Sequence, residues 1–181
     1  MNRETGAPTL LVRQPTVSQT HLAFLYAGDL WVANRDGRSP QRLTIHPGIK
    51  QRPSFSPDGQ WLAYSSGNLE AGYSVYVISV NGGSPTKLTF HPGNDWVQGW
   101  TPDGEQILFS SARDAVTQRI TRFFTVPRTG GFPTALPLPM AARGAYAPDG
   151  KRIAYAAIPE PFNTWKRYRG GQTSPIWIFD C

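Results

Sequence analysis

The chain has 181 residues, of which 39% are hydrophobic and only 17% are charged. Its 18 glycines and 17 prolines are spread between short apolar runs, which favours a turn-rich β protein over a disordered chain. The formal net charge is +6, but no run of five or more basic residues occurs, which argues against a nucleic-acid-binding protein.

The cellular compartment is indicated by the cysteine content and the N-terminus. Cys181 is the single cysteine, so no disulfide can form within the chain. Residues 1–8 have no apolar signal-peptide core, and no stretch approaches the roughly 18 apolar residues of a membrane span. We therefore expect a soluble cytoplasmic protein, without membrane contact, that starts with a disordered lead over residues 1–8.

The first predicted unit covers about residues 9–44. It contains short runs of aliphatic and aromatic residues that are too short for helices and have no helical spacing. Strands are predicted at Thr9–Val12, His21–Tyr26, Leu30–Asn34 and Gln41–Thr44.

The second unit, about residues 45–90, contains the turn that defines the repeat. Residues 56–59 read Ser-Pro-Asp-Gly. Proline sets φ at the first central position, the aspartate can bond the backbone two residues on, and glycine accepts a positive φ. Such a turn between two apolar runs closes a β-hairpin. Strands are predicted at Arg52–Ser56, Trp61–Ser65, Ser74–Val80 and Thr86–Thr89.

The same turn returns in a third and a fourth unit, at about residues 91–139 and 140–181. Asp58 and Asp103 are 45 residues apart, and Asp149 follows Asp103 by 46 residues. His-Pro-Gly turns at His46 and His91 keep the same 45-residue step. Strands are predicted at Val97–Thr101, Gln106–Ser110, Thr121–Val126, Thr134–Leu136, Ala145–Tyr146, Ile153–Ala157 and Ile176–Asp180.

A fixed step of roughly 40 to 45 residues with four short strands in each unit predicts the blades of a β-propeller. The predicted fold is therefore all-β, with about four four-stranded blades over residues 9–181, the last of which lacks its outer strand. One blade cannot bury both of its own apolar faces, so the blades must stack on one another. We expect an incomplete part of a larger ring, and a closed four-bladed ring is the alternative.

No catalytic, cofactor or metal site is predicted. His21, His46 and His91 are the only histidines, and no Gly-x-Ser-x-Gly elbow is present. The repeat of His46 at His91 favours a role in a turn, because a catalytic base has no reason to recur. The repeated aspartates lack the close spacing of calcium ligands, and the Gly-Gly pairs open no helix. Four tryptophans at periodic strand positions are predicted to fill the gaps between blades: Trp31, Trp61, Trp100 and Trp177.

The repeat, with Leu-Thr at the end of a unit, resembles TolB-type and peptidase-associated propeller repeats. The opening from Leu10–Pro15 to Asp29–Val32 resembles the start of the tricorn protease propeller. Residues 165–171 read Trp-Lys-Arg-Tyr-Arg-Gly-Gly and precede Ile176–Ile178. This pattern is similar to the fourth blade of that family's N-terminal six-bladed propeller. The resemblance covers about residues 9–181.

The resemblance implies that the chain is part of a cytosolic serine peptidase that trims peptides. The propeller would gate or steer peptides toward a catalytic domain that this chain does not contain, so that its partners would be peptides and the downstream propeller, PDZ-like and peptidase domains. The parent protein would be a homo-oligomer. Two alternatives remain: a TolB-type propeller that acts as a non-catalytic protein-binding scaffold, and the propeller of a prolyl-oligopeptidase-type hydrolase.

The loop at residues 165–171 contains the candidate contact residues Lys166, Arg167 and Arg169. Arginine is suited to bidentate pairing with carboxylates, so this loop could contact a peptide carboxylate or an acidic neighbouring domain. The alternative is a solvated loop that caps the fourth blade and needs Gly170 and Gly171 for its backbone geometry.

Overall fold

The computed structural model describes residues 11–115, 120–158 and 175–181. Within these residues the chain is all-β, and its strands are joined by turns and loops. The strands are β1 (Arg13–Val17), β2 (His21–Tyr26), β3 (Asp29–Asn34), β4 (Gln41–Arg42), β5 (Ile49–Phe55), β6 (Trp61–Asn68), β7 (Gly72–Ser79), β8 (Thr86–Lys87), β9 (Asp95–Trp100), β10 (Gln106–Ser111), β11 (Arg122–Pro127), β12 (Thr134–Ala135), β13 (Arg143–Tyr146), β14 (Arg152–Ala156) and β15 (Ile176–Asp180).

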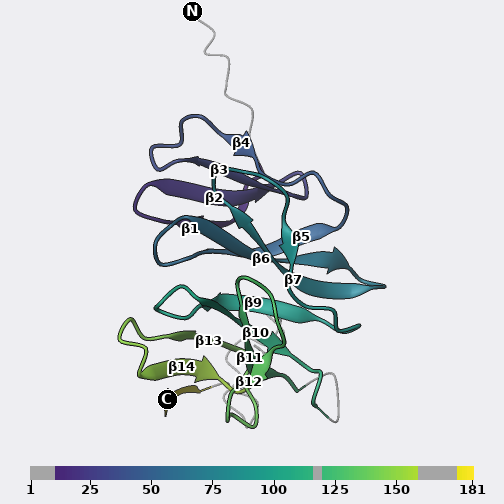
Figure 1. Cartoon of the computed structure of the whole chain (residues 1–181), viewed down its shortest axis with the longest axis vertical. Helices are drawn as coiled ribbons and strands as arrows, with labels where there is room; N and C mark the ends of the chain where they lie inside the picture. Colours follow the sequence, from purple (N-terminus) through teal and green to yellow (C-terminus); the bar gives the residue numbers. More distant parts are fainter. Residues whose placement is uncertain (1–10, 116–119, 159–174) are drawn as a thin grey trace, which may run out of the picture.

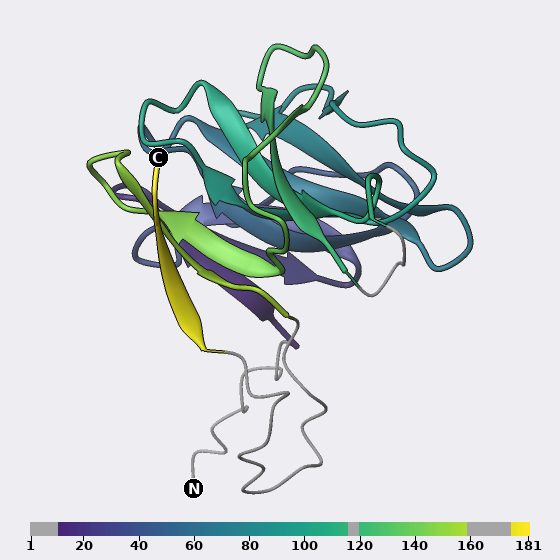
Figure 2. The same cartoon turned by 90° about the horizontal axis from the view of Figure 1, so that it is seen from below.

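The strands form four separate antiparallel sheets, each built from consecutive strands. The sheet orders are β1-β2-β3-β4, β5-β6-β7-β8, β9-β10-β11-β12 and β13-β14-β15. The sheets follow one another down the long axis of the molecule, with the N-terminal sheet at one end and the C-terminal sheet at the other (Figure 1). Seen from below, β15 lies at the edge of the last sheet (Figure 2). The arrangement is that of propeller blades in a ring that is not closed.

The first strand lies further along the chain than the sequence analysis predicted. Leu11 and Val12 are not part of a strand, and β1 begins at Arg13; Thr9 and Leu10 lie outside the described residues. The short turn after Val17 leads directly into β2 and pairs Val17 with Leu22. Because this pairing sets the register between the two strands, β1 covers the residues directly before the turn. The apolar run before Arg13 lies outside the strand.

The Pro-Asp-Gly turns have the predicted geometry. The Asp58 carboxylate accepts hydrogen bonds from the Ser56 hydroxyl and from the Gln60 N–H, the latter at 3.0 Å. These bonds lower the pKa of Asp58 below its usual value. Gly59 has a φ of +70°, which explains the need for glycine at this position.

Successive turns pack against one another from blade to blade. A Cβ placed on Gly104 would lie 3.5 Å from Cδ of Pro57, and one placed on Gly150 would lie 3.6 Å from Cγ of Pro102. At the first blade, where Pro-Asp-Gly is replaced, Ser18 lies against Gly59 in the same way. The repeated motif therefore forms contacts between blades as well as closing each hairpin.

Three apolar clusters lie between neighbouring sheets. The cluster between the first and second sheets includes Leu30 and Tyr64, and that between the second and third includes Val75 and Phe109. Leu108, Phe123 and Ile153 are fully buried between the third and fourth sheets. Neighbouring sheets thus bury the faces that they turn toward each other, as stacked blades must.

The four periodic tryptophans do not share one environment. Trp100 is buried in the cluster between the second and third sheets, and Trp61 packs against it. Trp31 is half-buried and makes an edge-to-face contact with Tyr26. Trp177 was predicted to fill a gap between blades, but its side chain is 54% exposed, because it lies in the last sheet of the arc. That prediction is wrong for Trp177.

The first strands of the four sheets converge. β1 contacts β5, β5 contacts β9, and β9 contacts β13, although each belongs to a different sheet. Each of these strands forms one edge of its sheet. The sheets therefore meet along these edges, which places β1, β5, β9 and β13 around the axis of the propeller. In the described part of the chain, no helix is long and apolar enough to cross a membrane.

Candidate functional site

A cavity of about 490 Å³ lies between the converging strands. We call it the axial cavity. All four inner strands contribute to its wall, which makes it a product of the blade arrangement and not of any single sheet. Its volume falls in the range of small-molecule sites. The lining residues are Gln14, Pro15, Gln51, Arg52, Pro53, Ser54, Val97, Gln98 and Arg143.

β-Bulges in β1 and β5 present side chains to this cavity. The pairing of β1 with β2 shifts between Arg13 and Thr16, and the pairing of β5 with β6 shifts between Gln51 and Ser54. Gln14 and Arg52 lie in these bulges with φ values of +47° and +52°. Left-handed backbone at a non-glycine residue is uncommon and is found preferentially at functional sites. A hydrogen bond from the Arg52 N–H to the Gln14 side-chain oxygen joins the two bulges.

Proline follows both bulged residues and explains why the bulges form there. Pro15 and Pro53 cannot donate a ladder hydrogen bond, so they are tolerated only on edge strands or at bulges. β1 and β5 provide both conditions. Arg52 was not among the predicted site residues, although two pairs of a polar residue and proline were a usable signal: Gln14-Pro15 and Arg52-Pro53.

Arg52 is held in place by an aromatic pair rather than by an acid. Its guanidinium carbon lies 5.0 Å from the centre of the Trp96 ring, and Trp96 in turn packs on Tyr73 with ring centres 4.4 Å apart. Cation–π contacts of this kind orient arginine while leaving its N–H donors available. Burial, and then the charge of Arg143, lower the pKa of Arg52 to about 10, so the side chain remains protonated at neutral pH.

Arg143 contributes a second positive charge from β13. Its side chain is exposed to the cavity, and none of the salt bridges among the described residues involves Arg52 or Arg143. The charge of Arg143 contributes to the lowered pKa of Arg52, so the two like charges repel each other across the cavity. The amide Gln98 supports the wall by donating hydrogen bonds to Ser110 and to the backbone oxygen of Trp96.

The strongest ionic contacts elsewhere are structural and join neighbouring blades. The buried Lys50 of β5 lies 3.0 Å from the Asp29 carboxylate of β3, and its ammonium also donates to two backbone oxygens. Burial raises the pKa of Asp29, but hydrogen bonds from Lys50, Thr44 and Arg42 outweigh burial and leave the pKa below its usual value. The charges of Lys50, Asp29 and Arg42 are therefore paired with one another, whereas the two arginines of the axial cavity have no acidic partner among the described residues.

The third blade contains a second buried ionic contact. Asp95, which is fully buried, accepts a hydrogen bond from Arg113 at 2.8 Å. The Arg113 guanidinium lies 5.0 Å from the ring centres of both Phe109 and Phe124. Within the described residues, no group of three or more histidine, cysteine, aspartate or glutamate side chains is arranged to hold a metal ion.

The repeated histidines have different local contacts. His46 stacks on Tyr76 with ring centres 5.3 Å apart, and its Nε2 lies 3.2 Å from the Ser66 hydroxyl. Burial, followed by the charge of Lys50, lowers the pKa of His46. The Nδ1 of His91 instead accepts a hydrogen bond from the Gly93 N–H.

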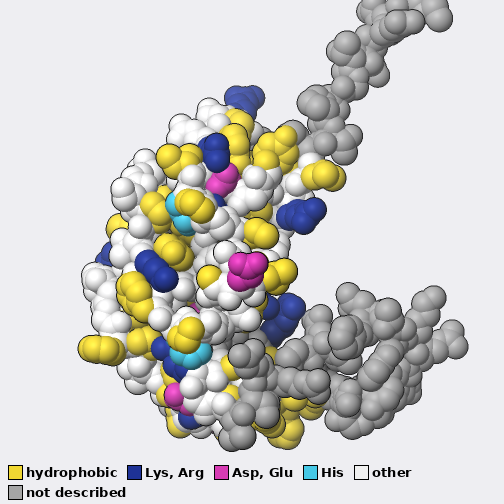
Figure 3. All heavy atoms as spheres, turned by 90° about the vertical axis from the view of Figure 1, so that its right-hand side faces the viewer, with side chains coloured by type: hydrophobic (Ala, Val, Ile, Leu, Met, Phe, Trp, Pro, Cys, Tyr) yellow, Lys and Arg dark blue, Asp and Glu magenta, His cyan; other side chains and the backbone are white. Residues whose placement is uncertain are grey.

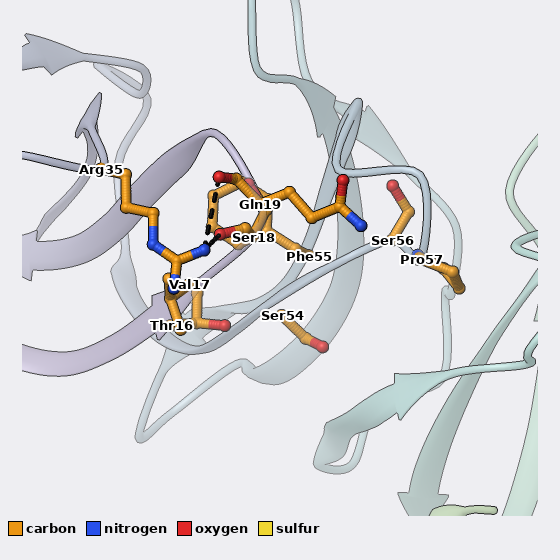
Figure 4. Close-up of a pocket in the computed structure, with 9 residues that line it drawn as sticks. All are labelled: Thr16, Val17, Ser18, Gln19, Arg35, Ser54, Phe55, Ser56 and Pro57. Carbon is orange, nitrogen blue, oxygen red and sulfur yellow. Dashed lines mark hydrogen bonds between the residues drawn. The ribbon is translucent and has the colours of Figure 1, made fainter. Parts of the chain in front are cut away.

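A second hollow, of about 460 Å³, lies between the first two blades near the turn at Ser18 (Figure 4). Arg35 lines it, but its guanidinium already donates to the backbone oxygens of Ser18 and Gln19. Because the guanidinium of its one lining cation is already engaged, this hollow offers a ligand fewer free donors than the axial cavity does.

The predicted contact residues Lys166, Arg167 and Arg169 lie outside the described residues, so their prediction stays untested. On the face shown in Figure 3, Lys and Arg side chains are scattered among apolar and uncharged ones and do not gather into one patch. In the axial cavity, by contrast, two arginines that take part in none of the salt bridges among the described residues, Arg52 and Arg143, line the same wall.

Comparison with solved structures supports the propeller fold. The crystal structure of the tricorn protease superposes with a TM-score of 0.80 at 24% identity, over 93% of this chain and 17% of that one. TolB from Acinetobacter baumannii superposes with a TM-score of 0.72 at 19% identity, over 94% of this chain and 41% of that one. At these identities the likeness shows the fold alone.

Sequence comparison gives two curated relatives. A tricorn protease homolog of Streptomyces coelicolor (homolog 2) is 33% identical over 177 residues, which is 92% of this chain and 15% of the relative. The Tol-Pal system protein TolB of Desulfosudis oleivorans is 38% identical over 60 residues, which is 31% of this chain and 14% of the relative. The matched segments thus span about a seventh of the length of either relative.

The family comparison covers nearly the whole chain. Residues 9–181 match the family described as the tricorn protease N-terminal beta propeller domain. Together with the all-β fold, the four stacked sheets and the unclosed ring, this match establishes that the chain belongs to the tricorn protease N-terminal β-propeller family.

Proposed function

We propose that this propeller is the peptide-steering module of a tricorn-like serine peptidase. It binds peptides at its axis and directs them to or from a catalytic domain elsewhere in the parent protein. The observation that carries this proposal is the axial cavity, which lies between the inner strands of four blades and contains two arginines without acidic partners. The backbone oxygens of a peptide can accept hydrogen bonds from the glutamine and arginine side chains of this wall, and its carboxylates can pair with the two guanidinium groups.

The parent protein in this proposal is a cytoplasmic hydrolase. Its further parts are a second propeller, a PDZ-like module and the peptidase domain, and it assembles as a homo-oligomer. Membership of the tricorn propeller family supports the further domains and the assembly. The single cysteine of this chain is compatible with a reducing compartment. Cell fractionation of the native protein tests the compartment directly, because recovery with periplasmic or extracellular proteins would overturn it.

Narrowing the axial cavity tests the steering role. In the full-length protein, Gln98→Trp is expected to lower kcat/KM about tenfold for a peptide of about a dozen residues, while leaving cleavage of a small chromogenic substrate unchanged. Gln51→Trp is the second variant, because Gln98 also makes hydrogen bonds within β9 and β10. Gln41→Trp, on the exposed outer strand β4, is the matched control. Equal rates for all variants, or equal loss for both substrates, would contradict the proposal.

A second candidate is a non-catalytic scaffold of the TolB type that binds other proteins. The similarity to TolB in sequence and in fold favours it. A fluorophosphonate probe, which reacts with activated serines, separates the two functions. Labelling of the full-length protein together with peptide hydrolysis supports the peptidase, whereas neither labelling nor hydrolysis supports the scaffold.

A further inference from the structure

We propose that Arg52 and Arg143 form a carboxylate-selective clamp in the axial cavity, which admits peptides with acidic side chains and disfavours cationic ones. This inference rests on the proposed peptide-steering function and assigns it a substrate class. The two residues come from different blades, β5 and β13, and both line the same cavity.

The charge balance of the cavity carries the argument. Its wall contains two guanidinium groups and no acidic residue. Elsewhere in the described chain, the buried Lys50 and the half-buried Arg113 lie beside the carboxylates of Asp29 and Asp95. The half-buried Arg122, which has no salt bridge among the described residues, donates instead to the backbone oxygens of Leu138 and Leu136. A carboxylate between Arg52 and Arg143 would relieve their repulsion and accept hydrogen bonds from both.

The local backbone keeps this arrangement in place. Arg52 adopts a left-handed conformation that is unfavourable for a residue with a side chain, and the Gln14 oxygen and the Trp96 ring hold it there. The Trp96 ring covers one face of the guanidinium, so its N–H edge remains for a ligand. A site whose donors are fixed before binding loses less conformational entropy when the ligand arrives.

Arginine suits this role better than lysine would. Guanidinium forms two parallel hydrogen bonds with a carboxylate, whereas an ammonium group acts as a point charge. The three amide side chains around the pair, Gln14, Gln51 and Gln98, are neutral and do not compete for the charge. The clamp therefore distinguishes glutamate and aspartate from glutamine and asparagine, which have nearly the same shape.

Binding of labelled peptides by fluorescence anisotropy tests the clamp. The probes are short Gly/Ser peptides, blocked at both ends, that carry two Glu, two Gln or two Lys residues. We expect the Glu peptide to bind about tenfold more tightly than the Gln peptide, with the Lys peptide weakest, and the preference to shrink as salt rises. Arg52→Gln or Arg143→Gln should remove the preference, and Arg52→Lys should retain part of it.

Arg38→Gln is the matched control. It removes the same charge from an exposed position where the arginine pairs with Asp36, so it leaves the preference unchanged if the effect is local. Arg143→Gln decides the result if Arg52→Gln does not fold, because the Arg143 side chain is exposed. An equal loss in Arg38→Gln would overturn the clamp in favour of net charge.

The remaining outcomes separate the clamp from the function on which it rests. Equal binding of Glu and Gln peptides, both weakened by Gln98→Trp, would overturn the clamp but leave peptide steering intact. No binding of any peptide would overturn both. Tight binding of a Gln peptide with a free C-terminal carboxylate, equal to that of the blocked Glu peptide, would show recognition of the chain end and overturn the assignment to acidic side chains.

Discussion

Asp29→Asn is expected to lower the free energy of unfolding by about 3 kcal/mol, because it leaves the Lys50 ammonium buried without its counter-charge. The side chain of Lys50 is only 2% exposed, and it links β5 of the second blade to β3 of the first. Its two backbone acceptors, the oxygens of His46 and Gly48, remain in the variant. They place the expected loss at the lower end of the range for breaking a buried ion pair. Urea unfolding at neutral pH measures it.

Asp36→Asn provides the control for this result. Asp36 also pairs with an arginine, Arg38, but the two side chains are 55% and 84% exposed. Exposed ion pairs contribute little, so this variant should stay within about 0.5 kcal/mol of the wild type. Equal effects of the two substitutions would show that the Asp29 contact does not hold the blades together.

The pH dependence gives an independent check on Asp29. Its pKa in the folded protein lies below the ordinary value of 3.8, so the folded state favours the ionised form. The stabilisation is therefore fully present above pH 3.8 and is lost as the pH falls through the folded-state pKa. The difference in stability between wild type and Asp29→Asn should narrow over that acidic range.

Phe109→Ala is expected to destabilise the protein by about 3–5 kcal/mol, the usual effect of truncating a fully buried phenylalanine. The ring lies between the second and third blades, stacks on Phe124 with ring centres 5.7 Å apart, and has no exposed surface. Phe132→Ala makes the same substitution at a side chain that is 95% exposed and should have almost no effect. Thermal and denaturant unfolding of the two variants provides the comparison.

The same variant distinguishes stacked blades from independent sheets. If the blades share their core, hydrogen exchange should become faster in β7 of the second sheet as well as in β10 and β11 of the third, because Val75 and Val77 belong to the same cluster as Phe109. Faster exchange confined to the third sheet would show that the sheets are stable separately.

The repeated turns made most of the fold predictable from sequence. Pro-Asp-Gly specifies a hairpin locally, and its near-constant step determines the number and order of the sheets without reference to long-range contacts. The position of β1 could not be predicted in this way, because its register depends on pairing with β2 and on the bulge at Pro15. The apolar run before Arg13 was a misleading signal for the same reason.

The axial cavity was less accessible from sequence than the fold. Arg52 and Arg143 are 91 residues apart and belong to different blades, so only the convergence of the inner strands brings them together. The two arginines form a candidate site because none of the described acidic residues lines the same cavity, and a short sequence motif does not show which residues line a cavity. Gln14-Pro15 and Arg52-Pro53 did mark the bulges, but a bulge alone does not specify which charges face the axis.

Nuclear Overhauser contacts between turns of neighbouring blades test most directly whether the repeats form radially stacked sheets. Strong contacts are expected between the ring protons of Pro57 and the α-protons of Gly104, and between those of Pro102 and Gly150, since these groups are adjacent in the structure. Their absence, together with backbone contacts that join β4 to β5 in one continuous sheet, would contradict the radial arrangement and remove the axial cavity that depends on it.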